Sequence, residues 1–366
     1  MKHILFISRG MAYGGSGRCI SVFSGQLAKA GYQVSLLVLR DYASEYAIAP
    51  DINVIRTHFM TDKVKVGKID VLCRWFPEII KSMKRLSPDL VIPFGVDICL
   101  LAMIGNFYNK RICVTVRSDP AREPANRIFR MLRDFIYRRA PYIWVQNDQQ
   151  KEWFRDFAQD QFVTVPNPIR EEICKQSVVY SGKMHRFITL GRLSKQKNQA
   201  LLINAFGKIS KKHKYVTLDI YGEGELRKEL EEQIKRIGCE KSIFLRGRTE
   251  NVIEALEAAD AFILSSNHEG MPNALMEAMA LGLPCISTDC NTGPRDLVTD
   301  KENGRLVPCN DVERLYEAIE SFILYPDVAV QYGKRARQDI CQRYQEQRIC
   351  SRFRAEVEKM CAGEEG

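Results

Sequence analysis

Apolar positions in the first half of the chain form short runs separated by longer stretches with helical periodicity. The runs are expected to be buried strands and lie at Ile4–Ile7, Gln33–Leu39, Val54–Arg56, Leu90–Pro93, Ile112–Val116 and Tyr142–Val145. The helical patterns between them are Cys19–Ala30, Lys68–Leu86 and Asn126–Arg139. Because alternating strands and helices form parallel sheets covered on both faces, residues 1–168 are expected to form a doubly wound α/β domain.

A break follows at Val165-Pro166-Asn167-Pro168, where two prolines interrupt regular structure, and a polar stretch continues to Lys183. Strand patterns then resume at Phe187–Leu190, Val216–Tyr221, Ile243–Leu245, Ala261–Leu264 and Pro284–Thr288. The helical patterns here are Gln199–Ile209, Glu225–Ile237, Val252–Ala258 and Asn273–Leu281. Residues 169–340 therefore predict a second Rossmann-like domain, and the helical pattern over 341–366 predicts a helix that crosses back to the first.

Composition supports a folded two-domain chain, with 45% hydrophobic and 27% charged residues over 366 positions. The apolar run Ile4–Ile7 is expected to be a first strand because it is too short for a signal peptide. No apolar stretch approaches the roughly 18 residues of a membrane span. The 12 cysteines are scattered without a Cys-x-x-Cys pair, so we expect reduced core thiols in a cytosolic protein and no metal site.

The positive charge is concentrated in the first half of the chain. Residues 1–172 contain 25 Lys and Arg and 17 Asp and Glu, which gives a net charge of +8. The net charge of the whole chain is +9. Such an excess suits phosphates, nucleic acid or an anionic membrane surface.

Two loops, each between an expected strand and an expected helix, contain residues that could bind an anion. The first contains Gly14, Gly15 and Ser16, whose small residues allow close approach to a helix N-terminus, although a plain strand–helix turn would look the same. The second runs from Gly191 through Arg192 to Lys197, a basic pair that could clamp a diphosphate or form only a solvated loop.

A third motif carries two carboxylates around one helix start. Glu269-Gly270-Met271-Pro272-Asn273 follows an expected strand, and Glu277 lies about two turns inside the next helix. Carboxylates accept hydrogen bonds from paired hydroxyls such as those of sugars and ribose. Glutamates on an exposed helix face are the alternative, but the apolar neighbours of Glu277 indicate partial burial.

Together these motifs resemble those of glycosyltransferase family 4. The likeness rests on the Glu269-x7-Glu277 spacing, the Gly191 to Lys197 loop, the Gly14-Gly15 turn and the Pro166-Asn167-Pro168 linker, and it covers nearly the whole chain. It implies the GT-B fold, in which two Rossmann-like domains face each other across a cleft. It also implies a retaining transferase that moves a hexose or N-acetylhexosamine from a nucleotide sugar, most simply UDP-linked, to a glycan acceptor in cell-surface polysaccharide synthesis.

The resemblance also implies roles for individual residues. Arg192 and Lys197 would bind the donor diphosphate, Glu269 the donor sugar and Glu277 the ribose. Backbone near Gly270, Met271, Pro272, Asn273 and Gly191 would complete the donor cradle, and the segment with Gly247 and Arg248 would pass the nucleobase. Gly14, Gly15 and Ser16 would form the acceptor or phosphate loop.

No cofactor and no metal are expected, and the sequence has no Asp-x-Asp motif that could hold a metal–diphosphate complex. One departure concerns the histidine that many family members carry after the strand matching Ile112–Val116. Here Arg117, Ser118 and Asp119 occupy that place. One of them could contact the sugar or acceptor, or the segment could be a structural turn before Pro120.

Arginines alternate with apolar residues over Arg122–Arg139, which is typical of a membrane-surface helix, although a helix that faces the core could share the pattern. We therefore expect a polyprenyl-diphosphate-linked acceptor and a peripheral, cytoplasmic position at the inner face of the plasma membrane. Two rival functions are a UDP-sugar 2-epimerase and a non-enzymatic nucleotide or nucleic-acid binder. The pair Glu269 and Glu277 favours glycosyl transfer over epimerisation. No nucleic-acid partner is expected, because the sequence has no recognised nucleic-acid-binding motif.

Overall fold

The computed structural model describes residues 1–12, 14–42, 45–57, 71–107, 110–180 and 182–362. The chain divides into two compact units. Unit 1 comprises Met1–Pro168 together with Gln347–Gly366, and unit 2 comprises Ile169–Glu346. The chain thus leaves unit 1, forms unit 2 and then returns, and each unit is described by itself below.

Unit 1 is built on a parallel sheet of seven strands in the order β3-β2-β1-β4-β5-β6-β7. These strands are β1 (His3–Ser8), β2 (Gln33–Val38), β3 (Asn53–Arg56), β4 (Leu90–Phe94), β5 (Arg111–Thr115), β6 (Tyr142–Val145) and β7 (Phe162–Thr164). All six residues of β1 are buried, as a central strand covered on both faces requires.

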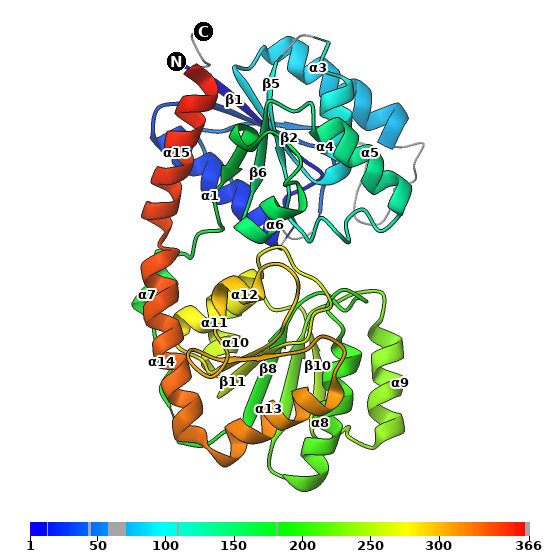
Figure 1. Cartoon of the computed structure of the whole chain (residues 1–366), viewed down its shortest axis with the longest axis vertical. Coiled ribbons are helices and arrows are strands. Elements are labelled where there is room, and N and C mark those ends of the chain that lie inside the picture. The colour runs from blue at the N-terminus through cyan, green and yellow to red at the C-terminus, as the bar shows by residue number, and fades with distance from the viewer. Residues whose placement is uncertain (13, 43–44, 58–70, 108–109, 181, 363–366) are drawn as a thin grey trace. The chain divides into compact units, whose positions relative to one another are not determined.

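Helices cover both faces of this sheet (Figure 1). One face is covered by α1 (Gly15–Lys29) and α15 (Glu346–Ala362). The helices on the other face are α3 (Phe76–Leu86), α4 (Val96–Ile104), α5 (Arg127–Tyr137) and α6 (Asp148–Trp153). A π-helical turn, Val71–Trp75, precedes α3, and a 3-10 turn, Gln159–Gln161, precedes β7.

The return of α15 to unit 1 depends on an aromatic contact in the core. The ring of Phe353 stacks on Trp144 of β6, with centroids 4.5 Å apart and planes 27° apart. Phe353 also packs on Phe23 of α1 at 4.5 Å. Aromatic side chains bury the largest apolar areas of any residue, so this cluster fastens a segment distant in the sequence to the sheet.

Unit 2 repeats the architecture with a six-stranded parallel sheet in the order β10-β9-β8-β11-β12-β13. Its strands are β8 (Arg186–Leu190), β9 (Thr217–Tyr221), β10 (Ile243–Gly247), β11 (Ala261–Leu264), β12 (Cys285–Thr288) and β13 (Arg305–Val307). One face packs against α8 (Gln199–Lys212), α9 (Arg227–Ile237) and α13 (Val312–Leu324). The other packs against α7 (Glu171–Lys175), α10 (Val252–Glu257), α11 (Asn273–Leu281), α12 (Pro294–Leu297) and the later part of α14 (Pro326–Arg343).

The two-sheet α/β architecture confirms the predicted fold class, while several short elements were missed. The edge strands β7 and β13 have only three residues each, too few to show a pattern. α4 is apolar except for Asp97 and so lacks helical periodicity. α7 lies inside the stretch expected to be a polar linker. The predicted helix over Lys68–Leu86 is realised from residue 71 onward, and residues 68–70 lie outside the described part.

The expectation of reduced thiols is wrong for two cysteines. Cys174 of α7 and Cys341 of α14 form a disulfide. Ten other cysteines are free, and eight of these are buried. The pairing was missed because 167 residues separate the partners in the sequence. Among the helices of the described residues, none combines the length and apolar character needed to cross a bilayer.

Candidate functional site

The predicted donor residues of unit 2 lie around the carboxyl ends of β8 and β11. These strands are neighbours, while β9 and β10 lie beyond β8 and β12 and β13 lie beyond β11. The strand order therefore reverses between β8 and β11. In open parallel sheets this reversal point is where ligands bind, because the loops on its two sides diverge.

Glu269 is the centre of the local hydrogen-bond network. Its side chain is only 6% exposed and accepts a hydrogen bond of 2.6 Å from the Lys197 ammonium. The Ser266 hydroxyl donates to the same carboxylate oxygen at 2.5 Å. The Thr292 hydroxyl donates to the Glu269 backbone carbonyl. Three loops, following β8, β11 and β12, are thus joined at one residue.

Further polar contacts fix the Lys197 loop against the loop after β11. The Asn267 amide donates to the Gln196 carbonyl at 2.8 Å, and the Gln196 side chain donates to the His268 carbonyl at 3.0 Å. The Ser265 hydroxyl donates to the Lys197 carbonyl at 3.0 Å. Because backbone groups on both sides are bonded, the position of Lys197 relative to Glu269 is set by the backbone rather than by the two side chains alone.

Close backbone packing at this edge requires glycine at Gly222. A Cβ atom there would lie 1.9 Å from the Gly191 carbonyl oxygen, and its φ of +146° disfavours other residues. A Cβ at Gly224 would lie 2.2 Å from the Leu193 carbonyl oxygen. The loop that carries Arg192 therefore rests directly on the backbone that follows β9.

The helix α11 begins at the predicted motif. Met271 and Pro272 are buried, Gly270 is buried before them, and Asn273 opens the helix. Pro272 is at the N-cap and provides no capping side chain. The N-terminus of a helix carries a partial positive charge and favours a bound anion.

Glu277 is buried within α11, as its apolar neighbours predicted. Its residue exposure is 7%, and one carboxylate oxygen lies 3.8 Å from the Arg170 guanidinium. That separation is a loose ion pair rather than a hydrogen bond. A buried carboxylate at this position can accept hydrogen bonds from the hydroxyl groups of a ligand.

The remaining predicted donor residues lie at the rim of this region. The side chains of Arg192 and Arg248 are exposed. Gly247 ends β10, and its carbonyl accepts from the Gly222 amide at 2.7 Å. The neighbouring Arg246 pairs with Asp219 at 2.6 Å. The structure therefore brings Lys197, Glu269 and the start of α11 together and places the two arginines where they are accessible.

Two thiols lie beside this network. Cys290 and Cys309 follow the neighbouring strands β12 and β13, and both sulphurs approach the Ser266 carbonyl oxygen, at 3.2 and 3.7 Å. Contact with the Cys290 thiol lowers the pKa of Cys309. Sequence spacing did not indicate this pair.

In unit 1, Gly14, Gly15 and Ser16 are exposed at the start of α1, and Gly14 at the N-cap brings no capping side chain. The linker residue Asn167 is buried nearby. Its side-chain oxygen accepts from the Gln146 amide at 2.7 Å and from the Cys19 thiol at 3.0 Å. The linker is thus part of a buried polar network at the carboxyl edge of the sheet.

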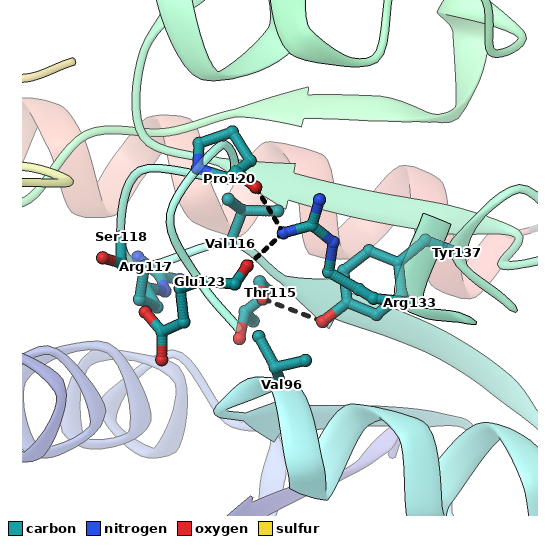
Figure 2. A pocket seen from close by; sticks show the side chains of 9 residues that line it. All are labelled: Val96, Thr115, Val116, Arg117, Ser118, Pro120, Glu123, Arg133 and Tyr137. Carbon is teal, nitrogen blue, oxygen red and sulfur yellow. Dashed lines mark hydrogen bonds between the residues drawn. The ribbon is translucent and has the colours of Figure 1, made fainter. Parts of the chain in front are cut away.

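Arg117, Ser118 and Asp119 follow β5 and differ in their surroundings (Figure 2). The Arg117 guanidinium lies over the Trp144 ring, 3.7 Å from its centroid. Burial lowers the pKa of Arg117 to about 10. The Ser118 carbonyl accepts from the Gln150 side chain, and Asp119 accepts from the Ala121 amide at 2.8 Å in a turn.

A small, partly open pocket lies beside these residues. It is lined by Val96, Thr115, Val116, Arg117, Ser118, Pro120, Glu123, Arg133 and Tyr137. Asp119 does contribute to a structural turn, as one of the two sequence interpretations held, while Arg117 and Ser118 face the pocket.

Sequence reasoning missed Ser266, Thr292, Gly222 and Gly224. Serine, threonine and single glycines outside a recognised motif carry little signal, and only the spatial contact with Glu269 or Gly191 shows their part. No group of three or more His, Cys, Asp or Glu side chains able to hold a metal occurs among the described residues.

Two sequence families match the chain. The family described as Glycosyltransferase Family 4 matches residues 13–172, and the one described as Glycosyl transferases group 1 matches residues 171–339. An uncharacterised glycosyltransferase of Methanocaldococcus jannaschii is 30% identical over 250 residues, which are 62% of each chain. A Campylobacter jejuni protein named GalNAc-alpha-(1->4)-GalNAc-alpha-(1->3)-diNAcBac-PP-undecaprenol alpha-1,4-N-acetyl-D-galactosaminyltransferase is 28% identical, covering 87% of this chain and 88% of its own.

Solved structures share the fold at low identity. Sucrose-phosphate synthase from Thermosynechococcus elongatus superposes with a TM-score of 0.86 at 18% identity, over 99% of this chain and 100% of that chain. Anabaena HepE in complex with UDP-glucose gives a TM-score of 0.81 at 17% identity, over 98% and 100%. These matches establish the GT-B architecture.

The close contact at Gly222 predicts a stability difference between two glycine substitutions. Gly222→Ala should lower the midpoint of thermal unfolding well below that of Gly238→Ala, measured by differential scanning fluorimetry. Both positions have positive φ, so each substitution carries backbone strain of about 1 kcal/mol. Only at Gly222 does the new methyl group meet backbone, whereas nothing lies within 4 Å at Gly238. Equal unfolding midpoints would contradict the close packing of the Arg192 loop.

Proposed function

We propose that this protein transfers a hexose or N-acetylhexosamine from a UDP-sugar to a glycan acceptor, with retention of configuration. The chain belongs to the glycosyltransferases, and its family 4 domain is followed by a group 1 domain. We further propose a polyprenyl-diphosphate-linked acceptor in cell-surface polysaccharide synthesis. The observation that carries the donor half is the cluster of Lys197, Glu269 and the start of α11 at the strand-order reversal of unit 2.

The donor diphosphate fits the cationic side of this cluster. Lys197 provides a fixed ammonium, the exposed Arg192 a mobile guanidinium, and α11 the partial positive charge of its N-terminus. As the glycosidic bond breaks, negative charge grows on the leaving diphosphate. Groups fixed before reaction stabilise that charge most effectively because they need not reorganise.

Glu269 and Glu277 suit the two hydroxyl-bearing ends of the donor. Glu269 already accepts from Lys197 and Ser266, and its remaining acceptor capacity could take a sugar hydroxyl. Donor binding would then draw Lys197 between the carboxylate and the diphosphate. Glu277, which is buried in α11 and lies 3.8 Å from the Arg170 guanidinium, could accept from the ribose hydroxyls.

The proposed reaction uses no protein nucleophile and no divalent metal. The leaving phosphate can accept the acceptor's proton on the face of the sugar from which it departs, which retains the configuration. Lys197 and Arg192 supply the positive charge that a metal ion would otherwise bring to a diphosphate.

The acceptor proposal rests on a relative and on α5. The matching Campylobacter jejuni protein is named for an acceptor linked to PP-undecaprenol. In this chain α5 exposes five large apolar side chains, while Arg133 and Tyr137 face the interior of unit 1. The five exposed side chains are Ile128, Phe129, Met131, Leu132 and Phe135, between 42% and 74% exposed, and the nearby Ile104 and Phe107 are exposed too.

Charge around α5 favours an anionic bilayer as the partner of this surface. Arg127, Arg138 and Arg139 are exposed on or beside the helix, and Arg122 is exposed just before it. Arg133 is not part of this basic surface, because it is 2% exposed and bonded inside unit 1. Insertion of the apolar side chains with arginines at the headgroups would hold the enzyme at the membrane where its acceptor is anchored.

Substitution of each glutamate by glutamine distinguishes the proposed ribose contact of Glu277 from the proposed sugar contact of Glu269. Glu277→Gln should raise the KM for the UDP-sugar about tenfold with little change in kcat, because a ribose contact acts in ground and transition states alike. Glu269→Gln should lower kcat by roughly 10- to 100-fold, as expected for loss of a charged hydrogen bond that strengthens in the transition state. Glu257→Gln on the exposed face of α10 is the control. Wild-type kinetics in both variants would refute the assignment.

Transfer should continue at an unchanged rate in excess EDTA. The expectation follows from the fixed Lys197 and the accessible Arg192, which can neutralise the diphosphate without a metal. Product formation is measured with and without chelator, and Mn²⁺ is then added back. Activity that is lost in EDTA and restored by Mn²⁺ would show that the reaction belongs to a metal-dependent class.

The wild type should float with anionic phospholipid vesicles, with binding that weakens as salt rises, because the Debye length is only about 8 Å at physiological ionic strength. Ile128→Ser with Met131→Ser should abolish flotation, since these side chains are 74% and 63% exposed. Leu324→Ser with Val328→Ser, which alters exposed apolar residues of unit 2, should leave it unchanged. If the wild type does not float at low salt, a soluble acceptor becomes the better proposal.

A further inference from the structure

Two free cysteines lie side by side at the edge of the donor region of unit 2. Cys290 follows β12 and Cys309 follows β13. These parallel strands pair so that Thr288 lies opposite Val307. The Asp289 amide continues the ladder by donating to the Val307 carbonyl at 2.7 Å. Each cysteine stands two residues beyond one of the paired residues, so the register brings the two cysteines opposite each other.

The spacing of these two positions suits a disulfide. Neighbouring strands of a sheet lie about 4.8 Å apart, and the Cα atoms of disulfide-bonded cysteines lie about 4.4–6.8 Å apart. The sulphurs of Cys290 and Cys309 both approach the Ser266 carbonyl oxygen, at 3.2 and 3.7 Å, and the two thiols contact each other. Oxidation therefore needs only a small movement of the two loops.

The two thiols differ in exposure and in acidity. Cys290 is 1% exposed, whereas Cys309 is partly exposed. The hydrogen bond from the Cys290 thiol lowers the pKa of Cys309, and the same contact together with burial raises the pKa of Cys290. Because the thiolate is the reactive form of cysteine, Cys309 is the group that attacks a reagent from solvent, and Cys290 is placed to resolve the product.

Cys290 is close to the groups that hold Glu269. Its thiol donates to the Ser266 carbonyl at 3.2 Å, and the Ser266 hydroxyl donates to the Glu269 carboxylate at 2.5 Å. Thr292, two residues after Cys290, donates to the Glu269 carbonyl. A new bond at the Cys290 sulphur removes one donor from the Ser266 carbonyl and shifts the loop that carries Thr292.

Cys309 is close to the loop that carries Lys197. Asn310, the next residue, accepts a hydrogen bond of 3.1 Å from the Asn198 side chain, and Asn198 directly follows Lys197. An S–S bond of about 2.05 Å is shorter than any nonbonded contact between two sulphur atoms, so its formation draws the loops after β12 and β13 together. Lys197 and Glu269 then lose the relative position that they have in the dithiol protein.

We propose that Cys290 and Cys309 are a reversible disulfide site, and that its oxidation weakens UDP-sugar binding. The inference rests on the proposed donor function of unit 2 and adds a means of regulating it. The oxidant is a low-molecular-weight disulfide such as oxidised glutathione. The Cys309 thiolate attacks one of its sulphurs and releases a first thiolate. Cys290 then loses its proton to solvent and attacks the Cys309 sulphur, which releases a second thiolate. One disulfide is consumed for the one formed, and the protons of the two protein thiols pass through solvent to the released thiols.

Peptide mapping under non-reducing conditions tests the bond itself. The reduced wild type is incubated with oxidised glutathione, and mass spectrometry should find the peptides of Cys290 and Cys309 joined. Calorimetry on the same samples should show that the Kd for UDP rises about tenfold or more, which corresponds to the loss of one hydrogen bond to a charged group. Dithiothreitol should restore the affinity of the reduced protein.

Two variants serve as controls. In Cys309→Ser the Kd for UDP should be the same before oxidised glutathione, after it and after dithiothreitol. That result excludes an effect of the disulfide between Cys174 and Cys341, which this variant retains. Cys73→Ser removes an exposed thiol of unit 1 and should respond to oxidised glutathione like the wild type.

Three outcomes would overturn the inference. The first is a stable glutathione adduct at Cys309, or free thiols at both positions, after oxidation. The second is a disulfide between Cys290 and Cys309 that leaves the Kd for UDP unchanged. The third is an equal loss of affinity in Cys309→Ser, which would place the effect at another thiol. If the reduced wild type does not bind UDP, the donor proposal fails and this inference fails with it. Normal UDP binding without the disulfide removes this inference alone.

Discussion

A buried carboxylate needs hydrogen-bond donors, and Glu269 obtains them from the loop after β8 and from its own loop after β11, while the loop after β12 donates to its backbone. Lys197 and Ser266 donate to its side chain, and Thr292 donates to its backbone carbonyl. Without Glu269, the ammonium of Lys197 would lose its ion-pair partner. The arrangement of the whole donor region, including the loop with Arg192 and the start of α11, depends on that compensation. The groups that fix the loops are the same groups that a diphosphate and a sugar would contact.

The sequence predicted the features that leave a periodic or spaced signal. Alternating strands and helices identified both sheets, and the Glu269-x7-Glu277 spacing identified two carboxylates that the structure buries at the edge of the unit 2 sheet. Features set by contacts between distant segments left no such signal. The disulfide between Cys174 of α7 and Cys341 of α14 depends on the packing of two helices that lie far apart in the sequence. The close approach of Gly222 to Gly191 depends on which loops meet at the edge of the sheet, and strand order decides that.

The helix α5 shows why amphipathic periodicity alone does not assign a buried face. Its pattern of arginines and apolar residues predicted either a core-facing or a membrane-facing helix. In the structure its buried residues are Arg133 and Tyr137, and the large apolar side chains are exposed. Arg133 can be buried because carbonyls of the preceding turn accept its hydrogen bonds. Only the position of those carbonyls, which sequence does not provide, decides between the two orientations.

The chain path has a consequence for the order of folding. Phe353 of α15 completes the aromatic cluster of Trp144 and Phe23, yet α15 follows the entire unit 2 in the chain. Domains usually fold in the order in which the ribosome releases them, beginning with the N-terminal one. Here unit 2 is contiguous and can fold as soon as it emerges, whereas unit 1 must wait with the part of its core that α15 covers still exposed. During synthesis the nascent first half therefore exposes apolar surface for as long as the ribosome takes to translate unit 2, which makes that half the natural client of chaperones.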